Sequence, residues 1–111
     1  MKSILVPRDL DTMKKLDIDQ APDEDLFKIN VDDKEIYHLF NSGFVDKVNQ
    51  NLNVIIDDFE YEEIIGNNEL YGIKELSYLF SVKYKNYSIY KKIYALSLIA
   101  IDRKTGLFFF F

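Results

Sequence analysis

The sequence has 111 residues, of which 48% are hydrophobic and 15% aromatic, and its formal net charge is −5. This length is typical of one domain, and this hydrophobic content is enough for a buried core, which excludes an intrinsically disordered chain. Because the sequence contains no cysteine, disulfides, thiolate catalysis and cysteine-ligated zinc are also excluded. We therefore expect residues 1–111 to form a single compact domain.

The charge is distributed unevenly along the chain. Residues 9–75 contain 18 acidic and 6 basic side chains, whereas residues 76–111 contain 1 acidic and 6 basic side chains. From Val48 to Ile73 there is no lysine or arginine. Most single acidic residues only keep a surface hydrated, but an asymmetry of this size favours association with a basic partner.

The first seven residues contain too few apolar side chains for a targeting segment. Only three apolar residues, Ile4 to Val6, follow Lys2 before Pro7, whereas a secretory signal needs about 7–15 and a membrane span about 20. We expect a cytoplasmic protein with no membrane partner.

In chain order, Ser3–Val6 is a β-prone run that Pro7 ends, and it predicts a short strand. Asp9 can cap a following helix that extends to Leu16. Residues 17–25 then form a predicted loop.

Asp32 and Glu35 have the spacing of a capping box and predict the start of a helix that carries Ile36 and Leu39. Residues 41–43 interrupt this helix, with Gly43 suited to a helix C-terminal turn and Ser42 able to begin the next helix.

An apolar stripe at helical spacing predicts one long helix from Phe44 to about Tyr61. An alternation over residues 54–65 also permits a strand there. The stripe consists of Phe44, Val45, Val48, Leu52, Ile55, Ile56 and Phe59.

On that predicted helix, Asp57, Asp58 and Glu60 face solvent, while Glu62 and Glu63 rotate back toward the apolar side. Because a buried unpaired glutamate is costly, the helix has to end near this point. The acidic run then lies at a helix C-terminus, where the macrodipole disfavours anions. Such a conflict between local preference and sequence is expected at a functional surface.

The remaining chain predicts a turn at residues 66–68, a helix over 69–81 and a last helix that Ser88 can cap and Gly106 can end. A hairpin with a strand at Leu98–Ile101 is the alternative to that last helix. Residues 107–111 predict a buried strand that pairs with Ser3–Val6. The fold class expected is α+β, predominantly helical, with four to five helices and short N- and C-terminal strands packed on them.

Motifs for catalysis are missing. The lone histidine, His38, is expected to be structural, and the sequence lacks the parts of a catalytic triad or a phosphate-binding loop. Clustered carboxylates can bind magnesium, but such sites draw ligands from several elements, and here one run holds them. We expect no enzymatic activity, no cofactor and no metal.

Two other segments suggest different functions. Basic and aromatic residues alternate from Lys83 to Lys92, a pattern that can hold single-stranded nucleic acid and that gives the alternative of a small nucleic-acid-associated regulatory protein. The other interpretation of this segment is a connection between helices in which the tyrosines are half-buried. Phe108–Phe111 can also serve as a hydrophobic docking tail instead of a buried strand.

Two runs, Ile55-Ile-Asp-Asp-Phe-Glu60 and Thr105-Gly-Leu-Phe-Phe-Phe-Phe111, in a small acidic chain without cysteine, resemble bacterial immunity proteins of polymorphic toxin and contact-dependent growth inhibition systems. The resemblance covers residues 36–111 in pattern. It implies an antitoxin that binds and neutralises the toxin domain of a neighbouring gene, often a basic nuclease.

Tyr61 and Tyr71 flank the acids and are the aromatic type that interface hot spots favour. We expect a monomer that binds its toxin through Asp57, Asp58, Glu60, Tyr61, Glu62, Glu63, Glu69 and Tyr71.

Overall fold

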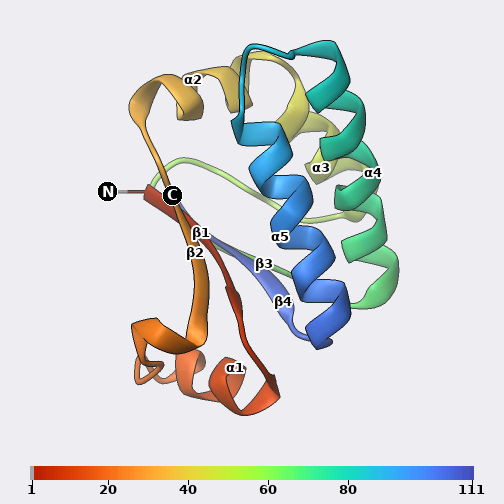
Figure 1. Ribbon diagram of the computed structural model, residues 1–111. Helices are drawn as coiled ribbons and strands as arrows, with labels where there is room; N and C mark the ends of the chain where they lie inside the picture. The colour runs from red at the N-terminus through yellow and green to blue at the C-terminus, as the bar shows by residue number, and fades with distance from the viewer. Residues whose placement is uncertain (1) are drawn as a thin grey trace.

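The computed structural model describes residues 2–111 and shows five α-helices with one four-stranded antiparallel sheet (Figure 1). This is the α+β class that the sequence predicts, with strands near both ends of the chain. The elements are β1 (Lys2–Pro7), α1 (Leu10–Asp17), a 3-10 turn (Asp23–Asp25), β2 (Leu26–Val31), α2 (Asp33–Asn41), α3 (Phe44–Leu52), β3 (Tyr61–Ile65), α4 (Asn67–Lys83), α5 (Ile89–Arg103) and β4 (Gly106–Phe110).

The two strands from opposite ends of the chain form the centre of the sheet. The strand order is β2-β1-β4-β3, and the register places Ile4 opposite Phe109 and Leu5 opposite Phe108. The predicted pairing of the phenylalanine-rich segment with Ser3–Val6 is therefore confirmed, and the side chains of Phe108 and Phe109 are buried. Because the phenylalanines serve as a central strand, they do not form a free docking tail.

The main core lies between the sheet and the two long helices α4 and α5, which run side by side along one face of the sheet (Figure 1). Alternate residues of the central strands, such as Val6 and Leu107, point into this core. The other face of the strands carries Leu5 and Phe108, which are also buried, and α1 packs against β1. Gly72 of α4 lets α3 approach closely, because a Cβ there would lie 2.5 Å from Leu52 Cδ2.

Most of the predicted helix starts are confirmed. The Asp9 carboxylate accepts a hydrogen bond from Thr12 N at 2.8 Å, and Asp32 and Glu35 form a complete capping box. The last helix follows Ser88 as predicted, which excludes the alternative hairpin, although the Ser88 side chain makes no capping hydrogen bond.

The prediction of one long helix from Phe44 to about Tyr61 is wrong, because α3 ends at Leu52. Asn53 takes a left-handed conformation with φ of 55° and turns the chain out of the helix. Beyond it, the Asn49 side chain bonds both the N–H and the carbonyl of Ile56, at 2.8 and 3.1 Å, and so supplies backbone partners in place of helical ones. The strand alternative for residues 54–65 is right only for Tyr61–Ile65.

Two smaller features also differ from expectation. Strand β2 follows the 3-10 turn, where no element was predicted, and it pairs with β1 along its whole length. Gly106 was expected to cap the last helix, but Lys104, with φ of 58°, makes that turn. Gly106 instead begins β4, where a Cβ would lie 2.8 Å from Ile65 Cγ1 on the adjacent strand.

No helix within residues 2–111 is both long enough and apolar enough to cross a membrane.

Candidate partner-binding surface

The eight residues predicted to bind a partner lie on three neighbouring elements. Asp57, Asp58 and Glu60 belong to the connection between α3 and β3, which we call the acidic loop (residues 53–60). Strand β3 carries Tyr61, Glu62 and Glu63, and the first turns of α4 carry Glu69 and Tyr71. None of these acids lies at a helix C-terminus, so the macrodipole argument for this surface is wrong.

The acidic loop is anchored at both ends by hydrogen bonds. Asn49 holds Ile56, whose side chain is buried. At the other end, Phe59 N donates to Phe111 O at 2.8 Å and Phe111 N donates to Glu60 O at 3.1 Å. The loop therefore presents its acids from a fixed backbone.

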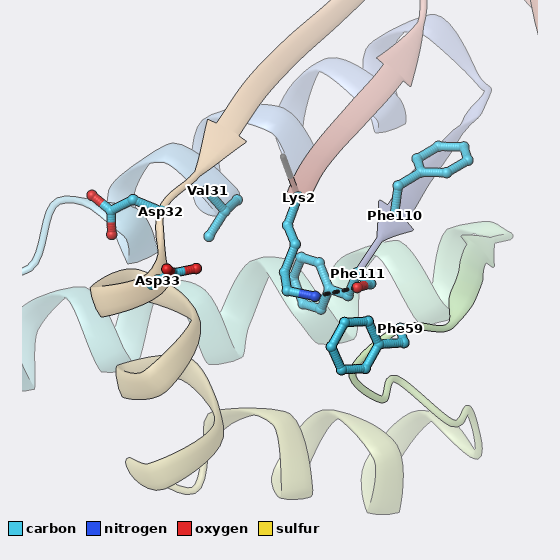
Figure 2. A pocket seen from close by; sticks show the side chains of 7 residues that line it. All are labelled: Lys2, Val31, Asp32, Asp33, Phe59, Phe110 and Phe111. Carbon is cyan, nitrogen blue, oxygen red and sulfur yellow. Dashed lines mark hydrogen bonds between the residues drawn. The ribbon is translucent and has the colours of Figure 1, made fainter.

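Lys2 lies beside the acidic loop and makes two contacts with it and one with Phe111 (Figure 2). Its ammonium group pairs with the Asp58 carboxylate, donates to Phe111 O and lies 4.2 Å from the centre of the Phe59 ring. A depression of about 520 Å³ opens beside it, with Asp32 and Asp33 on its other side. Asp58 is thus already neutralised by the chain itself.

Phe59 is the most unusual residue of the acidic loop. Its side chain is 88% exposed, and its backbone has a φ of 61°, in the left-handed region. A bulky residue rarely adopts this conformation, which costs about 1–2 kcal/mol. Ile55, on the same loop, is 73% exposed. Both side chains were predicted to face the core, and the structure places both at the surface.

The two glutamates of β3 have different surroundings. Glu62, on the same face of the strand as Phe109, accepts hydrogen bonds from Ile55 N at 2.8 Å and from Glu63 N at 3.0 Å. Its carboxylate therefore supports the backbone of the acidic loop. Charged side chains on an edge strand such as β3 also hinder pairing with another chain.

Tyr61 lies on the opposite face of β3, beside the rings of Phe108 and Phe110. Its hydroxyl donates to a Glu63 carboxylate oxygen at 2.8 Å. Burial, and next the Glu63 carboxylate, raise the pKa of Tyr61 above its usual value of 10. The Tyr61 hydroxyl therefore stays protonated and hydrogen-bonded to the Glu63 carboxylate, on the face of β3 opposite to Glu62.

Glu69 and Tyr71 are separated from Asp57, Asp58 and Glu60 by about the length of β3. The strand starts beside Phe110 and ends beside Gly106, a separation of roughly 13 Å at the usual rise of a strand. Tyr71 is exposed, and its ring lies 5.0 Å from the Lys74 ammonium. The predicted residues therefore form an acidic loop and a separate α4 end, not one continuous patch.

Helix α2 contributes residues to this surface that the sequence analysis missed. A groove of about 340 Å³ separates α2 from the acidic loop, and Tyr37 beside it is 70% exposed. Asp33 and Tyr37 are four residues apart on α2, so one helix face presents both. That spacing is the only signal in the sequence that could have indicated them. The groove is lined by Asp33, Ile36, Tyr37, Phe40, Asn41, Asp57 and Asp58.

Two of the three tyrosines in the segment 83–92, Tyr84 and Tyr90, are partly or fully buried, while Tyr87 is 42% exposed. Tyr90 is 0% exposed, and its hydroxyl lies 2.7 Å from both His38 Nδ1 and Ser42 Oγ. His38 stacks on Tyr87 with ring centres 3.6 Å apart and meets Tyr84 edge-on. Burial lowers the pKa of His38. The aromatic half of the predicted nucleic-acid pattern is therefore used for packing.

No three carboxylate or imidazole groups among residues 2–111 are placed to hold a metal ion. Comparisons with protein-family models, with curated proteins and with solved structures found no match to this chain.

Proposed function

We propose that this protein is a non-enzymatic immunity protein that neutralises a basic toxin domain, of the nuclease class, by covering the toxin's cationic surface with the acidic loop. The observation that carries the proposal is Phe59, an apolar ring exposed at 88% on a left-handed backbone among three acids. Folding alone would favour a small polar residue at this position. A large ring held outward is instead suited to a partner's surface, since aromatic residues are enriched at interfaces.

Charge supports the same function. Among residues 2–111, Asp57 and Glu60 make no ion pair, so their charges are available to a partner. A nuclease binds phosphate through a cationic site, and carboxylates on a rigid loop can occupy that site. Opposite potentials speed encounter, and close charge pairs across an interface can contribute about 1.5–7 kcal/mol.

The test is binding, by calorimetry, to the toxin domain encoded directly upstream, with rescue of growth when both proteins are expressed together. We expect the double variant Asp57→Lys, Glu60→Lys to weaken binding at least 100-fold. Neither side chain has an ion-pair partner among residues 2–111, so the fold should survive, as thermal unfolding will show.

A matched control changes the same net charge elsewhere, through Asp23→Lys and Glu24→Lys on the exposed 3-10 turn. We expect this control to bind within about threefold of the unchanged protein. Equal losses in both variants would show that total charge matters and that the acidic loop is not the site. No binding by the unchanged protein would refute the proposed role.

A further inference from the structure

The groove between α2 and the acidic loop is lined by apolar side chains and by carboxylates. Ile36 is buried and Phe40 half-buried, whereas Tyr37 is exposed, and Asp33 from α2 and Asp57 and Asp58 from the loop supply the carboxylates. No lysine or arginine lines this groove. Since Asp58 is paired with Lys2, the two carboxylates with no ion pair among the described residues are Asp33 and Asp57.

The chain itself shows how this surface binds a cation. The Lys2 ammonium lies over the Phe59 ring and donates to Phe111 O (Figure 2), and it also pairs with the Asp58 carboxylate. The groove repeats this combination with Tyr37 as the ring and Asp57 and Asp33 as the carboxylates. Asp58 thus binds the Lys2 ammonium and also lines the groove, which offers a ring and carboxylates of the same kinds.

We infer that the groove receives an arginine side chain of the basic partner. This inference rests on the proposed function, and it names the contact that the partner makes. An arginine has an apolar stem that suits the apolar lining supplied by Ile36 and Phe40. Its planar guanidinium can stack on the exposed Tyr37 ring while its N–H groups reach carboxylates on two sides. A lysine ammonium would also pair with the carboxylates, but it has no planar group to stack on Tyr37 and cannot donate two parallel hydrogen bonds to one carboxylate.

The first experiment needs no toxin. The peptides acetyl-Gly-Arg-Gly-amide, acetyl-Gly-Lys-Gly-amide and acetyl-Gly-citrulline-Gly-amide are titrated into the protein, and amide shifts are followed by NMR. Citrulline keeps the shape of arginine without its charge. We expect saturable millimolar binding of the arginine peptide, with the largest shifts at residues 33–41 and 57–58, lysine several-fold weaker and citrulline without effect. Shifts spread over all acidic surfaces, or equal responses to arginine and lysine, would overturn the inference.

The second experiment uses variants. Tyr37→Ala and Asp33→Asn should each abolish the peptide response and weaken toxin binding at least 10-fold. Tyr78→Ala is the matched control, since Tyr78 is also an exposed helical tyrosine but lies on α4. If the unchanged protein binds the toxin and Tyr37→Ala binds equally well, the groove assignment is wrong while the proposed function stands. If the arginine peptide binds the groove but the toxin does not bind, the proposed function is wrong while the guanidinium site stands.

Discussion

Two groups of aromatic residues in this protein have opposite environments. The rings of Phe44, Phe80 and Tyr84 each lie within 6 Å of the Tyr90 ring, centre to centre, and the Tyr90 hydroxyl has hydrogen-bond partners in His38 and Ser42. Beside the acidic loop, Phe59 and Tyr37 leave most of their surface in water. The sequence patterns suggest the reverse, since residues 83–92 have the composition of a binding surface and residues 44–59 that of a buried helix.

The difference shows that composition within one segment does not decide which aromatic residues are available to a partner. The tyrosines of residues 83–92 pack around His38, which α2 brings from far away in the chain, and only Tyr87 among them remains exposed. Phe59 stays exposed because its N–H donates to Phe111 O and because Asn49 holds the backbone of Ile56 three residues earlier, and both contacts keep the loop outside the core. The first group should therefore govern stability and the second group binding.

The largest effect on stability is expected from Tyr90→Ala. This change removes a completely buried ring and should lower the free energy of unfolding by about 3–5 kcal/mol. Urea unfolding followed by circular dichroism measures the loss. In contrast, Tyr37→Ala should change stability by no more than about 0.5 kcal/mol. A loss for Tyr37→Ala comparable to that for Tyr90→Ala would remove the distinction between the two groups.

A smaller effect is expected from Asn49→Ala, which leaves the N–H and carbonyl of Ile56 without their side-chain partner. The cost should be about 1–3 kcal/mol, as for other partly buried groups that lose a hydrogen bond. Amide hydrogen exchange at Ile56 should become faster, and the acidic loop should lose affinity for the toxin domain. Unchanged exchange at Ile56 would mean that the loop does not depend on Asn49.

A smaller effect on stability is expected from the protonation of His38 at low pH. Burial lowers the pKa of His38 below its usual value of 6.5 in the folded protein, so the unfolded chain binds this proton more readily. The stability contributed by the neutral ring is fully present above about pH 6.5 and is lost as the pH falls through the lower folded pKa. Thermal unfolding between pH 7 and pH 5 should show this decline, and His38→Gln should reduce it. Identical slopes in both proteins would exclude His38 as its source.

The smallest effect on stability is expected from Phe59→Asn. Asparagine tolerates a left-handed backbone, so the relief of strain should roughly offset the lost contact with Lys2, and stability should stay within about 1 kcal/mol. Toxin binding should nevertheless fall at least 10-fold, because the exposed ring is lost. A variant that is much less stable would show that Phe59 belongs to the structural group of aromatics.

Local signals in the sequence predict much of this fold. Asp9, Asp32 and Glu35 mark helix starts because capping depends on residues only three apart. The phenylalanine-rich strand is predictable because so apolar a run has to be buried. The end of α3 is not, since it depends on the left-handed turn at Asn53 and on the bond from Asn49 to Ile56. Strand β2 is held by pairing with β1, which no local pattern indicates.

The candidate surface was also predictable only where its residues are close together in the sequence. The acids of residues 57–63 are visible as a run in the sequence, although Glu62 serves the loop backbone. Asp33 and Tyr37 are brought to Asp57 by tertiary packing alone. They precede Asp57 by about twenty residues or more, so no local pattern in the sequence indicates that the three lie together.

The central pairing of β1 with β4 has a consequence for how the protein is made. Residues 3–5 cannot form the central strand pair until residues 108–110 have been synthesised. During synthesis, the apolar faces of α4 and α5 therefore emerge from the ribosome before their sheet exists. The nascent chain is exposed to aggregation until β4 is released, and closing so long a loop slows the final step. Fusions that hold β4 inside the ribosomal tunnel should therefore leave β3 without a partner strand and the centre of the sheet unformed.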